Sequence, residues 1–308
     1  MSKKSRSINQ LVGNRGSERR LSRADAFTAY VMDRLLFRLG RSKHAKELFL
    51  KGGLLVAHLV DSPHRFTRDI DLLRRHGRPS PDDLREMFRE IVSISSEDGI
   101  EFKPDDVRAI AADHDEDGYD SVKVFVRAKV ARREVEIRID IGFGDAVVPP
   151  ASRVVLTPFL DGDEPARVFA YDARPVIAEK IETLLSKFPV VLHRLKDILD
   201  VVTLANAHDF TGAELVDSLR ATLERRETVA DIRVLDDMRD VLGDRKWQTA
   251  WASMRREKAV ADSIDLATAI GQFDTFVRPI LLSVTGEQSP PTRWEPVGPW
   301  HYDTDEPR

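Results

Sequence analysis

The sequence predicts an α+β protein in which a small sheet with helices on one side precedes an α-helical domain. Up to residue 174, strand-like alternation appears between helical segments, whereas every periodic segment after Pro175 repeats at the helical spacing. We therefore expect four parts: a basic N-terminal arm over residues 1–22, a mixed domain over 23–174, a helical domain over 175–285 and a Pro-rich tail over 286–308.

The composition limits the chemistry that this chain can perform. Its 308 residues include no cysteine, which excludes disulfides, thiolate metal sites and cysteine nucleophiles. With 48 basic and 52 acidic residues the net charge is -4, so any polyanion site must be a local cluster. The richest apolar run, from Leu48 to Val60, is interrupted by Lys51 and His58 and is too short to span a membrane. No apolar segment of a signal peptide follows the basic start. We expect a cytoplasmic protein without a membrane partner.

The two ends of the chain are the parts with the least periodicity. The arm carries many basic residues against the single acidic Glu18, and RNA or an acidic partner can bind such a segment. A solvated, poorly ordered terminus is the interpretation that we favour. The tail contains Trp294 and Trp300 among prolines and charges, and we expect it to be disordered or draped over the surface.

In the first half, helices and strands alternate. Helical spacing predicts helices over 23–39, 54–60 and 81–94, the last with Ser80 as its N-cap. Strands are expected over 47–51 and 67–73, and period-two alternation predicts a hairpin of the segments 122–127 and 135–141. Two more extended pieces follow at 154–159 and 167–171.

The second half is predicted to be helical throughout. Helices are expected over 176–188, 193–205, 212–226 and 263–283. Thr211 and Glu214 have the spacing of a capping box at the start of the third of these helices.

Two glycines, Gly52 and Gly53, stand where a strand runs into a helix. Without a Cβ they let the backbone approach a ligand, and the new helix presents unpaired N–H groups to an anion. A simple tight turn is the alternative explanation of the pair.

Asp69 and Asp71 lie on one predicted strand with Ile70 between them. Their carboxylates point to the same face, so both can bind one divalent cation through hard oxygen ligands. A solvated strand face is the alternative, but Arg65, Thr67 and Arg68 just before the pair add donors for phosphate. Asp140 ends another apolar strand and joins this pair if the strands are neighbours, although an ion pair with Arg138 explains it equally well.

Candidate residues of the helical half lie on two successive helices. Lys180 falls on the flank of the buried stripe, from which it can reach a phosphate or simply extend into solvent. Arg194 and Asp197 are i,i+3 neighbours, so they form either an internal salt bridge or a pair in which Asp197 serves as a general base.

Four segments in this order resemble the AbiEii/AbiGii toxin family of nucleotidyltransferases. They are Lys51-Gly52-Gly53, Arg65-Phe66-Thr67-Arg68-Asp69-Ile70-Asp71, Ala178-Glu179-Lys180 and Arg194-Leu195-Lys196-Asp197-Ile198-Leu199-Asp200. The resemblance covers about half of the chain. It implies that residues 23–174 form a polymerase-β-like nucleotidyltransferase core, and that the chain is the toxin of a type IV-like toxin–antitoxin or phage-defence pair.

The same resemblance implies a role for each matching residue. Asp69 and Asp71 would hold Mg²⁺ or Mn²⁺, with Asp140 as a third ligand from the general fold. Asp197 would complete the catalytic site and activate the acceptor hydroxyl, and Lys180 would contact the triphosphate. The other residues assigned to the nucleoside triphosphate are Lys51, Gly52, Gly53, Arg65, Thr67, Arg68 and Arg194.

The implied reaction is transfer of a nucleoside monophosphate from an NTP to the 3′ acceptor end of tRNA, which an antitoxin encoded beside the toxin would prevent. Two alternatives remain open. The enzyme can instead modify a protein or a small molecule, as a resistance enzyme does, or the chain can be a non-catalytic nucleotide-binding module.

Overall fold

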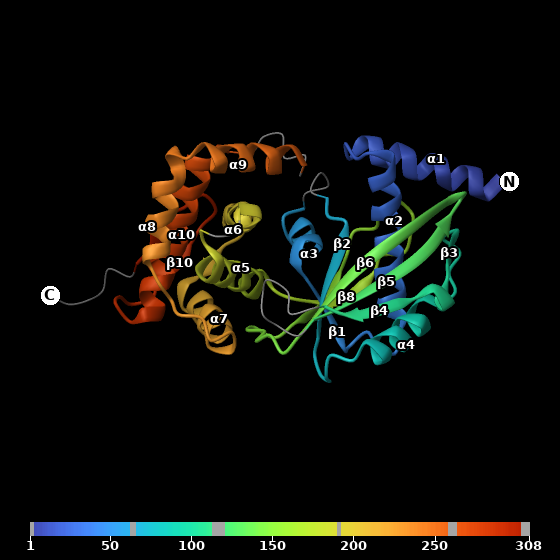
Figure 1. The fold of residues 1–308 in the computed structure, drawn as a ribbon, viewed down its shortest axis with the longest axis horizontal. Helices are drawn as coiled ribbons and strands as arrows, with labels where there is room; N and C mark the ends of the chain where they lie inside the picture. Colours follow the sequence, from blue (N-terminus) through green and yellow to red (C-terminus); the bar gives the residue numbers. More distant parts are fainter. Residues whose placement is uncertain (1–2, 62–65, 113–120, 190–191, 258–263, 303–308) are drawn as a thin grey trace. The chain divides into compact units, whose positions relative to one another are not determined.

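The structure is a computed structural model, and it describes residues 3–61, 66–112, 121–189, 192–257 and 264–302 (Figure 1). The chain divides into two compact units. The first comprises Met1–Gly144 and Ala151–Tyr171, and the second Asp145–Pro150 and Asp172–Arg308. Each unit is described by itself below.

The first unit is built on an eight-stranded mixed sheet with the order β3-β5-β6-β2-β1-β8-β7, in which β4 also pairs with β5. Its strands are β1 Leu48–Lys51, β2 Asp69–Arg74, β3 Ile100–Phe102, β4 Arg108–Ala111, β5 Ser121–Val130, β6 Arg133–Phe143, β7 Ser152–Val155 and β8 Arg167–Ala170. The pairs β1/β8 and β2/β6 are parallel, and the other pairs are antiparallel. The predicted hairpin is present as β5 and β6, whereas β3 and β4 were not predicted.

Four α-helices of the described residues belong to this unit: α1 Lys3–Glu18, α2 Arg23–Arg41, α3 Gly52–Leu59 and α4 Pro81–Val92. A short 3-10 helix at Pro104–Asp106 follows β3. The buried faces of α2 and α4 pack on the sheet (Figure 1). Ser80 caps α4 as predicted, because its side chain accepts a hydrogen bond from the Asp83 N–H.

The prediction of a poorly ordered N-terminal arm is wrong for its described part, which forms helix α1 and packs on α2. Val12 is fully buried, and a Cβ at Gly16 would collide with Ala26, so the two helices approach closely there. The reason is that α1 packs through a few separate contacts, such as those of Val12 and Gly16, which leave little apolar periodicity among the basic residues.

The second unit contains six α-helices in the described residues: α5 Ala173–Lys187, α6 Leu195–Ala207, α7 Gly212–Arg225, α8 Arg233–Asp240, α9 Arg245–Glu257 and α10 Leu266–Thr285. Short 3-10 helices occupy Leu192–Arg194 and Val241–Gly243. The helices α8 and α9 were not predicted. Thr211 is the N-cap residue of α7, but the predicted capping box is wrong, because the Thr211 side chain makes no capping bond and Glu214 pairs with Arg174 at 2.7 Å.

The first part of the predicted tail is packed against the helices of the second unit. The strands β9 Phe210–Thr211, β10 Arg293–Trp294 and β11 Trp300–His301 form a small sheet. Trp294 and Trp300 are both buried against Phe276, and their indole N–H groups donate to backbone carbonyls. The disordered alternative is therefore wrong up to residue 302, and residues 303–308 lie outside the described part of the chain. Among the described helices, none has the length and apolar character needed to cross a membrane.

The packing of α1 predicts a difference between two neighbouring residues. Val12→Ala should lower the free energy of unfolding by about 1–3 kcal/mol, because it leaves a cavity between helices. Leu11, whose side chain is half exposed, provides the control, since Leu11→Ala should change this free energy by no more than about 0.5 kcal/mol. Urea unfolding followed by circular dichroism measures both. Equal, negligible effects would mean that α1 is a detached arm.

Candidate active site

A row of charged residues crosses four neighbouring strands of the first unit at matching register. Asp71 on β2 lies between Lys51 on β1 and Asp140 on β6, and Asp140 is in turn the partner of Lys123 on β5. Partners in register share one face of a sheet, while the alternating Ile70 and its neighbours are buried on the other face. The structure thus brings Asp140 next to the aspartate pair, as the sequence suggested.

The Gly-Gly turn lies directly against Asp71. The backbone N–H of Gly53 donates a hydrogen bond to Asp71 Oδ2 at 3.3 Å. Gly52 has a φ of 66°, and a Cβ at this position would collide with the Asp71 carboxylate. Glycine is therefore required at position 52 by both backbone conformation and space, and the tight-turn explanation is incomplete, because the turn also contacts a candidate catalytic residue.

Asp69 and Asp140 share one guanidinium. Arg138 Nη2 lies 2.6 Å from Asp69 Oδ2 and 3.1 Å from Asp140 Oδ2. The Thr67 hydroxyl donates a further hydrogen bond to Asp69. The sequence suggested the pair of Arg138 with Asp140, but the contact of Arg138 with Asp69 depends on the pairing of β2 with β6, which no local pattern indicates.

The surroundings of Asp140 perturb its carboxyl group. Burial and, to a smaller extent, the nearby Asp71 and Asp69 raise its pKa to about 6 against the opposing charge of Arg138. Its Oδ1 is buried and accepts no hydrogen bond from the described residues. A buried acceptor without a donor is costly, so this oxygen is suited to a cation or a proton.

The donor chemistry around these aspartates fits Mg²⁺, although the arrangement in the described residues is not a metal centre. No group of three or more His, Asp or Glu side chains among those residues is placed to hold a metal ion. Arg138 already lies between two of the three carboxylates. Three aspartates on adjacent strands, one with an unsatisfied oxygen, nevertheless supply the hard oxygen ligands that Mg²⁺ prefers.

The remaining candidates of the first unit surround this row. Arg68 is largely exposed and its Nε donates to Asp25 Oδ1 at 2.9 Å. Lys51 places its ammonium 5.7 Å from the centre of the Tyr171 ring. Arg65 lies outside the described residues.

Lys180, Asp197 and Asp200 form a buried cluster in the second unit. Lys180 Nζ lies 2.7 Å from Asp197 Oδ1 and 2.6 Å from Asp200 Oδ2. Arg194 Nη1 is farther away, at 3.8 Å from Asp197 Oδ2. Burial alone would lower the pKa of Lys180, but the two carboxylates outweigh it and raise this pKa.

This cluster changes two of the sequence-based interpretations. The closer partner of Asp197 is Lys180 and not Arg194, and Lys180 does not simply extend into solvent. Asp200 has a partner that sequence reasoning did not assign, because the contact requires α5 to pack on α6.

The chain has a mixed α+β fold that is similar to the fold of known nucleotidyltransferase-like structures. The structure is similar to the crystal structure of a candidate nucleotidyltransferase from H. pylori, with a TM-score of 0.52 and 14% identity over 87% of this chain and 99% of that chain. JHP933 from Helicobacter pylori is another similar structure, with a TM-score of 0.48 and 16% identity over 85% of this chain and 94% of that chain. At 14% identity the likeness to the first of these structures concerns the fold alone.

The family is shown by the sequence itself. Residues 34–275 match the family described as nucleotidyl transferase AbiEii toxin of the type IV toxin–antitoxin system. The chain therefore belongs to the AbiEii nucleotidyltransferase toxin family. No curated protein sequence matches the chain.

The buried cluster of the second unit predicts a large effect of a single substitution. Lys180→Met should lower the free energy of unfolding by about 3–5 kcal/mol, because it leaves Asp197 and Asp200 buried without their cation. Urea unfolding followed by tryptophan fluorescence suits this test, since every tryptophan of the chain lies in the second unit.

Lys246→Met is the matched control, because the Lys246 side chain is mostly exposed and its loss should cost at most about 1 kcal/mol. Since the pKa of Lys180 is raised on folding, the stabilisation should be complete below the ordinary lysine pKa and decline as the pH rises above it. Equal stability of the two variants would contradict the cluster.

Proposed function

We propose that this protein is a Mg²⁺-dependent enzyme that transfers a nucleoside monophosphate from an NTP to an acceptor hydroxyl, with the 3′ acceptor end of tRNA as the acceptor. The observation that carries this proposal is the contact of the Gly52-Gly53 turn with Asp71, which itself lies in register with Asp140. Membership of the AbiEii family supports it further.

Three aspartates are proposed to hold the cation: Asp69, Asp71 and Asp140. Bound there, Mg²⁺ or Mn²⁺ supplies positive charge to the phosphate oxygens. The aspartates fix the position of that charge, because Asp71 is held by the Gly53 N–H and Asp69 by the Thr67 hydroxyl. Mg²⁺ is bound in proteins through a few carboxylates together with substrate phosphates, which matches this small set.

The start of α3 is proposed to bind the triphosphate. Helix α3 begins at Gly52, and the first turn of a helix presents backbone N–H groups that stabilise a phosphate. Lys51 precedes this helix on β1, and Thr67 lies within 4 Å of the position of a Gly53 Cβ. Arg68 and, from the sequence alone, Arg65 add positive charge for the departing pyrophosphate.

The proposed reaction breaks the bond between the α-phosphorus and its bridging oxygen. The acceptor hydroxyl forms the new bond to the α-phosphorus, and pyrophosphate leaves with the bridging oxygen. Asp197 is proposed to accept the hydroxyl proton, and Lys180 and Arg194 to contact the triphosphate. The pairing of Lys180 with two carboxylates supports a second role for this lysine, because it fixes the position of the proposed base.

Consumption of tRNA acceptor ends would stop translation, so we propose that the protein acts as a toxin in the cytoplasm and that an antitoxin encoded beside it prevents this. Arrest of translation would also prevent the multiplication of an infecting phage, so we propose a role in phage defence. Two competing functions remain: modification of a protein or small molecule, and nucleotide binding without catalysis. With a radiolabelled nucleotide, the first would label a protein or small molecule, and the second would label no acceptor.

The first prediction on function concerns Asp69. Asp69→Asn should lower nucleotide transfer at least about a hundredfold while the protein stays folded, because the cation would lose a charged ligand. Asp105→Asn, at a side chain 93% exposed, is the control and should transfer normally. Incubation with each radiolabelled NTP, Mg²⁺ and total tRNA measures the transfer, and the same variant should relieve growth arrest in cells.

Label on RNA supports the tRNA proposal, and label only on protein or a small molecule supports the alternative acceptor. Undiminished transfer by Asp69→Asn would refute the assignment of this carboxylate. No transfer by the unaltered protein to any acceptor, together with nucleotide binding, would favour the non-catalytic module.

The second prediction on function separates catalysis by Asp197 from its structural role. Asp197→Asn should slow transfer by about 10²–10⁴-fold, because a general base is lost. Asp200→Asn is the matched control, since it removes the other carboxylate bound to Lys180 and should reduce the rate less. Single-turnover rates of both variants decide this. If the two rates fall equally, Asp197 is a positioning residue for Lys180.

A further inference from the structure

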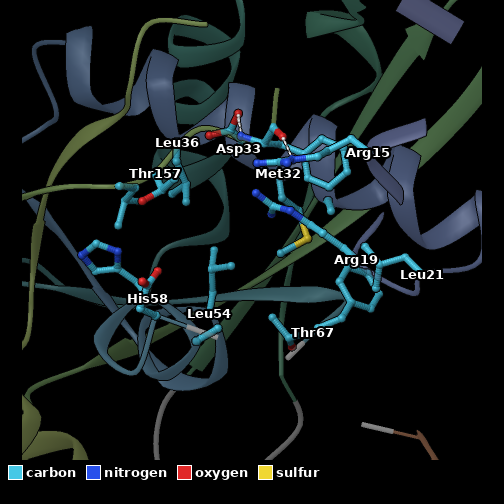
Figure 2. Close-up of a pocket in the computed structure, with 16 residues that line it drawn as sticks. Arg15, Arg19, Leu21, Met32, Asp33, Leu36, Leu54, His58, Thr67 and Thr157 are labelled. Carbon is cyan, nitrogen blue, oxygen red and sulfur yellow. Dashed lines mark hydrogen bonds between the residues drawn. The ribbon is translucent and has the colours of Figure 1, made fainter. Parts of the chain in front are cut away.

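A cavity of about 340 Å³ lies within the first unit, beside the candidate active site. Its walls come from α1, the segment around Leu21, α2, α3, residues 66–67 and the segment Leu156–Phe159 (Figure 2). Most of the lining is apolar, for example Met32, Leu36 and Leu54. Cavities of this size, mainly apolar with a few polar groups, are typical sites for small ligands.

Arg19 provides an unusual cation in this cavity. Figure 2 shows its side chain running from the end of α1 toward the middle of the space. Its guanidinium lies 4.8 Å from the centre of the Phe159 ring, but no hydrogen bond or ion pair to the described residues holds it, and its Nε is buried without a partner. Burial and the nearby Arg15 lower the pKa of Arg19. An anion would satisfy these donors.

The charged neighbours of Arg19 are already engaged. Arg15 Nη2 lies 3.1 Å from Asp161 Oδ1, and its Nε donates to the Phe159 carbonyl. Asp33 Oδ2 accepts from the Phe159 N–H at 3.1 Å and from Arg34 at 3.0 Å. Of the two arginines that line the cavity, Arg15 is therefore occupied by protein partners, whereas Arg19 has no hydrogen-bond or ion-pair partner among the described residues and can donate to a ligand.

The wall formed by α3 combines apolar and neutral polar groups. Leu54 and Ala57 give it apolar surface, and His58 lines it one residue further on. Burial lowers the pKa of His58, so its imidazole is neutral near pH 7 and offers both a donor and an acceptor. Thr157 adds a hydroxyl. A flat heteroaromatic ring with polar edges fits such a wall.

The cavity is connected to the candidate active site through Thr67 and α3. Thr67 lines the cavity and also donates a hydrogen bond to Asp69. The same helix that supplies Leu54, Ala57 and His58 to the cavity begins at the Gly-Gly turn on Asp71. A molecule in the cavity can therefore contact Thr67, whose hydroxyl is hydrogen-bonded to the candidate catalytic carboxylate of Asp69.

We propose that this cavity binds one nucleotide unit, with the base against Leu54, Ala57 and His58 and a phosphate on Arg19. This inference deepens the proposed function and rests on it, since the nucleotide unit belongs either to the incoming NTP or to the end of the acceptor RNA. Both sources share the same chemistry, an aromatic base joined to a phosphate anion.

Binding is measured by titration calorimetry of the full chain in EDTA with each nucleoside 5′-monophosphate. Arg19→Gln should weaken binding at least about tenfold, because a charged hydrogen bond is lost. Arg20→Gln is the matched control, since Arg20 is the exposed neighbour of Arg19 and does not line the cavity. Ala57→Phe, which fills the apolar side, should also weaken binding, and circular dichroism reports whether each variant is folded.

Nucleotide transfer by the unaltered protein is measured separately, so that the proposed reaction and binding in the cavity are tested independently. A failure of transfer with cavity binding intact would count against the proposed function alone. Absence of monophosphate binding, or equal affinity of Arg19→Gln and Arg20→Gln, would overturn the cavity assignment.

Two further titrations identify the source of the nucleotide unit. If Arg19→Gln binds NTP more weakly than the unaltered protein does, the cavity binds the NTP. If it binds short single-stranded RNA more weakly, the cavity binds the acceptor end of the RNA. Either result supports the proposal, and an unchanged affinity for both ligands contradicts it.

Discussion

The in-register parallel pairing of β2 with β6 is the constraint on which the candidate site depends. It places Asp71 directly beside Asp140 and Asp69 beside Arg138. The alternate residues, including Ile70 and Ile139, are almost completely buried. A shift of one residue would bring carboxylates into the core and isoleucines into solvent, so core packing helps to hold the charged face in place.

That arrangement collects like charges, and the structure compensates for them from both sides. The two aspartates in register are flanked by Lys51 and Lys123, and Arg138 bridges Asp69 and Asp140. The compensation is incomplete, since burial and the neighbouring carboxylates still raise the pKa of Asp140 to about 6. A carboxyl that is costly to ionise favours the arrival of a cation, and Arg138 is the group with which such a cation has to compete.

The sequence predicted those elements whose pattern is local. The alternation of Val122, Val124 and Val126 with Lys123, Phe125 and Arg127 identified β5, and Ser80 before Pro81 marked the start of α4. The short strands β3 and β4 have too few residues for a period to appear. Thr211 and Glu214 have the capping spacing, but Arg174 on another helix binds Glu214 instead, a competition that no local pattern contains.

The candidate site residues also divide into those that a local pattern reveals and those that depend on contacts between distant elements. Gly52, Asp69 and Asp71 are recognisable because each acts within a few residues of the others along the chain or across one strand pair. The partners of Lys180 depend on the packing of α5 on α6. Membership of a family indicates the role of a residue, but it does not reveal which oppositely charged residues surround it.

A net charge of -4 gives no hint of anion binding, yet Arg19 shows why a total charge is a poor guide. The basic residues of the N-terminal segment lie close together in the sequence, but the structure gives them different surroundings. Arg15 is bound by Asp161 and the Phe159 carbonyl, whereas Arg19 faces the cavity with its donors unsatisfied. The difference arises because α1 packs through Val12 and Gly16, which directs the following turn toward α3. The partners that the fold provides, not the number of charges, determine which arginine is available to a ligand.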